Sequence, residues 1–187
     1  DLTKLKNLKE MVDYAAENYC DVDFLQYKTE KGIESKTYID FQKACDAFSR
    51  MIEDRLPEGA HTAIIGPTSF EWIASYFGTA DCGSAAIPLA TGETDEMNCK
   101  LMDFADANVL VFDRKHENLY KMMKEYNSKI KLFISVDNAS EWDDVENISD
   151  LLSEYDGEYT NSLDGDTMCA IVFTSGTTGF PKGVMLT

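Results

Sequence analysis

The chain has 187 residues, of which 44% are hydrophobic, and its 34 acidic against 17 basic side chains give a formal net charge of −17. This length and apolar content suit a folded domain and exclude a disordered tail. So negative a surface repels phosphate backbones and anionic lipid headgroups, which argues against a nucleic-acid or membrane-surface role.

The five cysteines and two histidines of the chain show no metal-ligand spacing. No CxxC pair occurs, and neither His61 nor His116 has a Cys or a second His at ligand spacing. We therefore expect reduced, buried thiols and no metal site. The N-terminal sequence DLTKLKNLKE lacks an apolar targeting segment, and no apolar run approaches membrane-spanning length. These features predict a cytoplasmic globular protein without a transmembrane segment.

Hydrophobic residues alternate between helical and strand periodicity from the N-terminus onward. Apolar residues recur at helical spacing from Leu5 to Tyr19, and residues 24–28 have the pattern of a strand. Asp40 is predicted to cap the next helix, whose apolar face runs over residues 41–52. A short buried strand is expected at residues 62–66, ended by a proline.

The next helix has a candidate capping box at its start. In Thr68-Ser69-Phe70-Glu71 the Thr68 hydroxyl could accept from the amide three residues on, while Glu71 reaches back. The alternation then continues to residue 136. We expect strands at 84–89, 108–112 and 131–136, and helices around 97–104 and 114–126.

Continuous apolar strands separated by amphipathic helices predict an α/β fold, with a layered, parallel-rich sheet covered by helices on both faces. Residues 137–166 are acidic and polar, and we interpret them as a surface connection with a short helix around 148–155. Their carboxylates show no calcium-loop spacing. A last strand at 168–174 and an extended segment at 183–187 place a polar loop between two strands.

That loop, TSGTTGFPKG at residues 174–183, has the composition of a phosphate cradle. Its four hydroxyl donors are Thr174, Ser175, Thr177 and Thr178. Its glycines permit backbone turns that expose amide groups, and they are Gly176, Gly179 and Gly183. Lys182 adds a positive charge and is the only Lys or Arg after Lys131. In so acidic a chain, the single late cation falls inside the glycine-rich loop.

Other interpretations of the loop fit less well. A plain connecting turn with a solvated lysine does not require Pro181 and Lys182 in register between two strands. The Walker pattern fails because, counted from Gly176, Pro181 stands where its second glycine belongs, and no helix pattern follows the loop. No GxGxxG motif occurs anywhere in the chain.

The 14 residues TSGTTGFPKGVMLT closely resemble the phosphate-binding signature of the adenylate-forming (AMP-binding) enzymes, which include acyl-CoA synthetases, luciferases and peptide-synthetase adenylation domains. Weaker similarity extends upstream, in TYIDF (37–41), in AIIGPTSFEW (63–72), where Thr68 replaces the usual Asn, and in GSAAIPLA (83–90). FEW together with GVMLT favours the acyl-CoA synthetase branch, in particular the fatty-acid–CoA ligases.

The resemblance implies an ATP-dependent acid–CoA ligase. In that family a carboxylate attacks the α-phosphate of Mg-ATP to give an acyl-adenylate and pyrophosphate, and coenzyme A then displaces AMP. It implies ATP, Mg²⁺ and coenzyme A as cofactors and a small-molecule carboxylic acid as partner. It also implies a loop that wraps the β- and γ-phosphates, formed by Ser175, Gly176, Thr177, Thr178 and Gly179. Thr174 would lie at the rim, and Lys182 would be the catalytic residue that neutralises phosphate charge.

The family's enzymes are much longer, and their remaining catalytic motifs lie beyond the position of Thr187. We therefore interpret residues 1–187 as the N-terminal part of an AMP-binding (adenylation) domain, truncated just after the phosphate-binding loop, and expect no adenylation by this chain alone. Two alternatives stay open. One is an adenylation domain that loads a carrier protein, and the other is a non-catalytic nucleotide-binding module.

Overall fold

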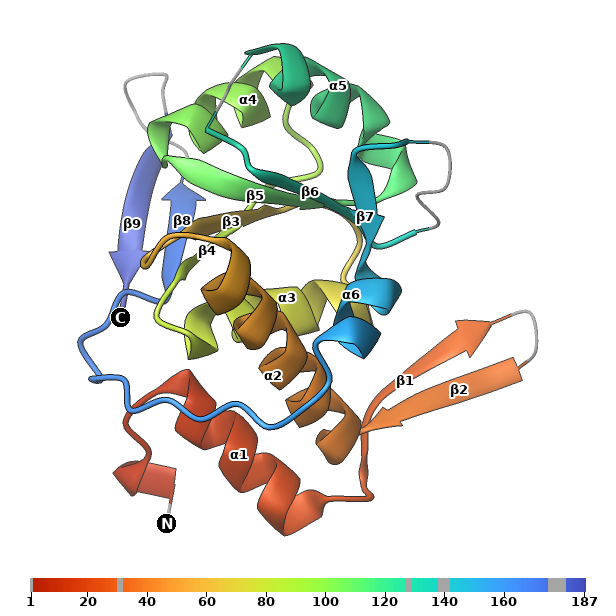
Figure 1. The fold of residues 1–187 in the computed structure, drawn as a ribbon, viewed down its shortest axis with the longest axis vertical. Coiled ribbons are helices and arrows are strands. Elements are labelled where there is room, and N and C mark those ends of the chain that lie inside the picture. Colours follow the sequence, from red (N-terminus) through yellow and green to blue (C-terminus); the bar gives the residue numbers. More distant parts are fainter. Residues whose placement is uncertain (1, 30–31, 127–128, 138–141, 175–180) are drawn as a thin grey trace.

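The structure is a computed structural model that describes residues 2–29, 32–126, 129–137, 142–174 and 181–187 (Figure 1). Its centre is a seven-stranded sheet in the order β7-β6-β5-β3-β4-β8-β9. The strands are β3 (His61–Ile64), β4 (Ala85–Pro88), β5 (Ala107–Phe112), β6 (Leu132–Ser135), β7 (Val145–Asn147), β8 (Ala170–Thr174) and β9 (Lys182–Leu186). Neighbouring strands from β7 to β8 are parallel, and only β9 runs antiparallel. The predicted parallel-rich α/β sheet is confirmed.

Helices cover both faces of this sheet (Figure 1). One face carries α4 (Asp95–Phe104) and α5 (Glu117–Tyr126), and the other carries α2 (Tyr38–Arg55), α3 (Phe70–Asp81) and α6 (Ile148–Glu154). Helix α1 (Leu8–Tyr19) packs outside α2 and α3 as a further layer. Short 3₁₀ turns occur at η1 (Leu2–Lys4) and η2 (Arg114–His116). The layered arrangement follows from strands that are apolar on both sides.

The core is divided by the sheet into two apolar layers. Leu110 and Phe112 of β5 are fully buried under α4 and α5, whereas Val109 and Val111 of the same strand face α2 and α6. This alternation follows from the two-residue period of a strand. Each large side chain buried in this way contributes roughly 1.5–3 kcal/mol relative to an exposed one.

Two strands carry too little apolar pattern to be predicted. Strand β2 (Gly32–Thr37) pairs antiparallel with β1 (Asp23–Thr29), which was predicted, in a hairpin that projects from the body (Figure 1). Most β2 side chains are exposed, so its sequence lacks the alternation that marks a half-buried strand. Strand β7 has three residues, inside the region predicted as a surface connection.

Both helix caps predicted from the sequence were wrong by one to three residues. Helix α2 is capped by Thr37, whose hydroxyl accepts from the Asp40 amide at 3.2 Å while Asp40 accepts from the Thr37 amide at 2.9 Å. Asp40 is thus the third residue of a capping box rather than the cap. Helix α3 is capped by Ser69, which accepts from the Trp72 amide at 3.2 Å, and not by Thr68.

The segment that leads into β8 crosses the outer helices before it enters the sheet (Figure 1). Its Leu163 carbonyl accepts from the Asn7 side chain at 3.0 Å, and its Tyr159 amide donates to Asp46 at 3.3 Å. These contacts tie the predicted surface connection to α1 and α2, and they fix where β8 begins.

All five cysteines are free, but the prediction that they are buried holds only in part. Cys45 and Cys99 are buried, Cys82 and Cys169 are half-buried, and Cys20 is exposed at the end of α1. No helix in the described ranges combines the length and the apolar character needed to cross a membrane.

Candidate phosphate-binding hairpin

The candidate site lies where β8 ends and β9 begins, at the edge of the sheet (Figure 1). The two strands pair from Ala170 opposite Leu186 to Thr174 opposite Lys182. The structure therefore brings together Thr174 and Lys182, eight residues apart in the sequence. The other predicted phosphate-contacting residues lie outside the described part of the chain, and they are Ser175, Gly176, Thr177, Thr178 and Gly179.

The register of the hairpin places Thr174 and Lys182 on one face. Residues directly opposite each other in an antiparallel pair share a face, and successive residues alternate. Phe173 and Gly183 therefore lie on the opposite face. The Thr174 hydroxyl lies 3.5 Å from the carbonyl oxygen of Lys182, too long for a strong hydrogen bond. This hydroxyl is therefore available to an anion next to the Lys182 side chain.

Lys182 is exposed, and its partners differ from those of four other lysines. Lys9, Lys121, Lys124 and Lys129 each form an ion pair with a carboxylate. Within the ranges that the structure describes, no carboxylate forms an ion pair with Lys182. Its charge can therefore act on a bound anion without first breaking an internal contact.

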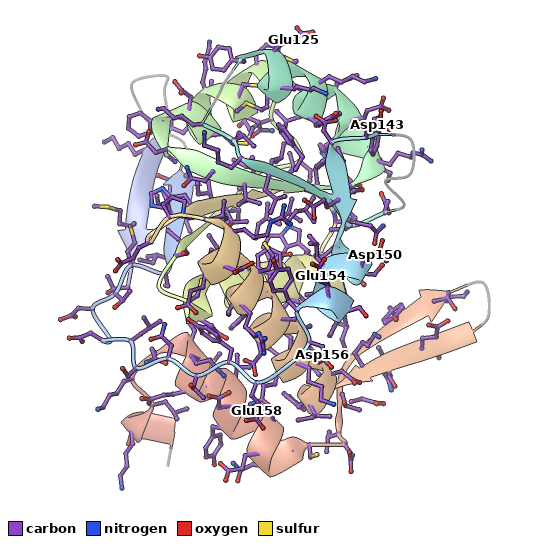
Figure 2. The ribbon with its side chains drawn as sticks, viewed as in Figure 1. Glu125, Asp143, Asp150, Glu154, Asp156 and Glu158 are labelled. Atoms are coloured by element: carbon purple, nitrogen blue, oxygen red, sulfur yellow. The ribbon has the colours of Figure 1, made fainter. Side chains whose placement is uncertain are left out.

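Five acidic side chains between residues 143 and 158 lie away from the hairpin in space, whereas Glu93 lines the cavity that adjoins it. Asp143, Asp150, Glu154, Asp156 and Glu158 are exposed. Figure 2 shows them over β7, α6 and the segment that follows α6, well separated from β9. Among the described residues, no three His, Cys, Asp or Glu side chains are grouped to hold a metal ion. We therefore assign none of the described residues to Mg²⁺.

A cavity of about 100 Å³ adjoins the hairpin at the carboxyl ends of β4 and β8. It is lined by Pro88, Leu89, Ala90, Glu93, Leu101, Phe173, Thr174 and Pro181. Ligands of open α/β sheets bind outside the carboxyl ends of their strands, so this location fits a binding edge. Sequence reasoning missed the cavity because its walls come from three separate elements. The only available signal was that β4 and β8 end at the same edge.

A larger cavity, of about 400 Å³, lies between α1 and residues 163–169 and reaches Thr187, at the other end of β9. Neither Thr174 nor Lys182 borders it. This larger cavity is therefore not adjacent to the two described residues that the sequence predicts to contact phosphate.

Two curated relatives are similar to the chain over nearly its whole length. A Bacillus subtilis protein named as an acyl-CoA synthetase, YngI, is 27% identical over 202 residues, which cover 95% of this chain and 36% of the relative. A crotonobetaine/carnitine–CoA ligase of Salmonella paratyphi A is 25% identical over 193 residues. That alignment includes the whole of this chain and 37% of the relative. The chain thus spans little more than a third of the length of these relatives.

The fold is shared with solved adenylate-forming enzymes. A Mycobacterium tuberculosis fatty acyl CoA synthetase superposes with a TM-score of 0.80 at 19% identity, over 98% of this chain and 35% of that one. The anthranilate CoA ligase AuaEII gives 0.84 at 16% identity, over 96% and 34%. The family model described as AMP-binding enzyme matches residues 12–187. The predicted resemblance is confirmed, and the chain belongs to the AMP-binding enzyme family.

Proposed function

We propose that this chain is the N-terminal part of the adenylation domain of a longer acid–CoA ligase. That enzyme activates a carboxylic acid, for which we propose a fatty acid, as acyl-AMP and transfers the acyl group to coenzyme A. The observation that carries the proposal is the hairpin, which presents Thr174 and Lys182 on one face at the two ends of the signature loop. No carboxylate in the described part of the chain forms an ion pair with Lys182. Relatives named as an acyl-CoA synthetase and as CoA ligases support the reaction class.

In the first half-reaction, a carboxylate oxygen bonds to the α-phosphorus of ATP while the bond to pyrophosphate breaks. Negative charge then builds up on the leaving pyrophosphate. We assign Lys182 to the neutralisation of that charge and Thr174 to a hydrogen bond to a phosphate oxygen. The amides and hydroxyls of residues 175–179 complete the proposed cradle, and Mg²⁺ bound with ATP supplies further positive charge. In the second half-reaction, the thiol of coenzyme A attacks the acyl carbon and AMP leaves.

Product analysis of the longer protein tests this proposal. We expect acyl-CoA and AMP to accumulate from Mg-ATP, coenzyme A and one chain-length class of acids between acetate and palmitate. If pyrophosphate is released only when an acid is present but no acyl-CoA forms, the acyl acceptor would be a carrier protein and not coenzyme A. Absence of any acid-dependent product would overturn the proposal in favour of a nucleotide-binding module. The 187-residue chain alone should give no product.

Substitution of Lys182 tests its role within the reaction. Lys182→Ala in the longer protein should slow adenylation about 100-fold, the usual effect of removing one group that stabilises developing charge. The KM for the acid should change little, because Lys182 is assigned to the phosphates. Lys115→Ala, at an exposed lysine of η2, is the matched control. Equal adenylation rates for both variants would show that Lys182 takes no part in the reaction.

A further inference from the structure

Gly183 lies inside β9, where its lack of a side chain allows a close contact. It is not among the described glycines with a positive φ, so the sequence-based expectation that it permits a backbone turn was wrong. A Cβ atom built on Gly183 would lie 3.2 Å from Ile171 Cγ2 and 3.3 Å from Phe173 Cε1. Both distances are shorter than ordinary contacts of carbon atoms, which are roughly 3.5–4.0 Å. The Ile171 methyl and the edge of the Phe173 ring therefore occupy the space where a side chain at position 183 would begin.

Phe173 also links the hairpin to the rest of the sheet edge. It stands directly opposite Gly183 in the β8–β9 register and borders the 100 Å³ cavity together with Leu101 and Pro181. Its ring centroid lies 6.4 Å from that of Phe104, at the end of α4. One side chain thus contacts the start of β9 and α4.

We propose that Phe173 and Gly183 form a positioning pair that fixes the start of β9 against the end of β8. The ring packs on the hairpin face opposite to Thr174 and Lys182, so it sets the place of Lys182 without contacting a ligand. An aromatic ring over a strand glycine is a known means of holding two strands in register. The inference rests on the proposed function, because the loop that it positions is the one proposed to bind phosphates.

The cavity predicts how a side chain at position 183 would act. A new Cβ must displace both the Cγ2 methyl of Ile171 and the Phe173 ring by a few tenths of an ångström, and the ring borders a cavity into which it can move. The fold should therefore tolerate the substitution. Pro181 borders the same space and directly precedes Lys182, so the displacement reaches the end of the phosphate-binding loop. Misplacement of a catalytic group by about 1 Å can cost on the order of 100-fold in rate.

Gly183→Ala in the longer protein is the primary test, with Gly92→Ala as the matched control because a Cβ there meets no atom within 4 Å. We expect Gly183→Ala to lower the kcat of ATP–pyrophosphate exchange about tenfold or more, with an unchanged KM for the acid and a thermal midpoint close to that of the parent. Adding Phe173→Leu to Gly183→Ala should restore part of the rate, because it removes the ring atom at 3.3 Å and leaves only the contact with the Ile171 methyl at 3.2 Å. An unchanged kcat in Gly183→Ala, or no recovery in the double variant, overturns the proposal.

A structural measurement separates this inference from the proposed function. In the proton NMR spectrum of the 187-residue chain, the ring current of Phe173 should displace the resonances of the Gly183 α-protons, and Phe173→Leu should abolish this displacement. If the resonances are displaced but the longer protein shows no exchange, the ring–glycine contact stands and the proposed function is rejected. Unshifted α-protons would reject the contact itself.

Discussion

Asp81 should make the stability of the folded chain fall as the pH rises. It is the last residue of α3, its side chain is fully buried, and neither carboxylate oxygen has a hydrogen-bond partner among the described residues. Burial raises the pKa of Asp81 to about 8; Lys9 opposes the rise, and the nearby carboxylates Asp13 and Asp46 add to it. Asp81 is therefore a neutral acid in the folded state at neutral pH.

The size of the effect follows from proton linkage. The pKa of the unfolded carboxyl is 3.8, so between about pH 4 and pH 8 the folded state holds a proton that the unfolded state has lost. The free energy of unfolding then falls by about 1.4 kcal/mol per pH unit. The stabilisation is complete below pH 4 and is lost as the pH rises towards 8. Between pH 5 and pH 8 the loss amounts to about 4 kcal/mol.

Urea unfolding of the unsubstituted chain and of Asp81→Asn at pH 5, 6, 7 and 8 measures how much Asp81 contributes to the pH dependence of the free energy of unfolding. The amide does not titrate, so the stability of Asp81→Asn relative to the parent should increase by about 4 kcal/mol over that range. Glu158→Gln, at an exposed carboxylate, is the control and should show no comparable trend. A difference between Asp81→Asn and the parent that stays constant with pH would refute the reasoning.

Three further outcomes are expected. Thr37→Ala should lower the free energy of unfolding by about 1 kcal/mol through loss of the α2 cap, whereas Thr68→Ala should leave it nearly unchanged, as denaturant titration can measure. Gly78→Ala should cost about 1–3 kcal/mol, because its Cβ would lie 2.7 Å from a carbonyl oxygen and from a Cβ atom of α2, and Gly92→Ala should be neutral by the same assay. A thiol reagent should modify one cysteine of the folded chain rapidly, and Cys20→Ser should remove that fast phase.

The order of helices and strands could be predicted because most elements bury a continuous apolar face. The β5 sequence NVLVF is apolar throughout, and both faces of that strand are covered. Strand β2 could not be found in this way, since it is held by main-chain pairing to β1 and exposes most of its side chains. The cap of α3 was misplaced because Thr68 and Ser69 have equivalent hydroxyls. Only the backbone at Ser69, with φ −128° and ψ 174°, decides between them.

The candidate site was predicted in part. Composition pointed to Thr174 and Lys182, and the register places them opposite each other at the open end of a hairpin. The contact between Phe173 and Gly183 could not be predicted, because it depends on which residues of β8 and β9 stand opposite each other. Gly183 follows a polar loop, and its sequence context therefore suggested a turn. Only the structure shows that the Phe173 ring lies close to it.

The central claim is that the loop between β8 and β9 serves adenylate formation, and acid-dependent ATP–pyrophosphate exchange in the absence of coenzyme A tests it most directly. The longer protein should incorporate labelled pyrophosphate into ATP only when a suitable acid is present, with one class preferred between acetate and palmitate. Exchange that is absent with every carboxylic acid offered would contradict the claim.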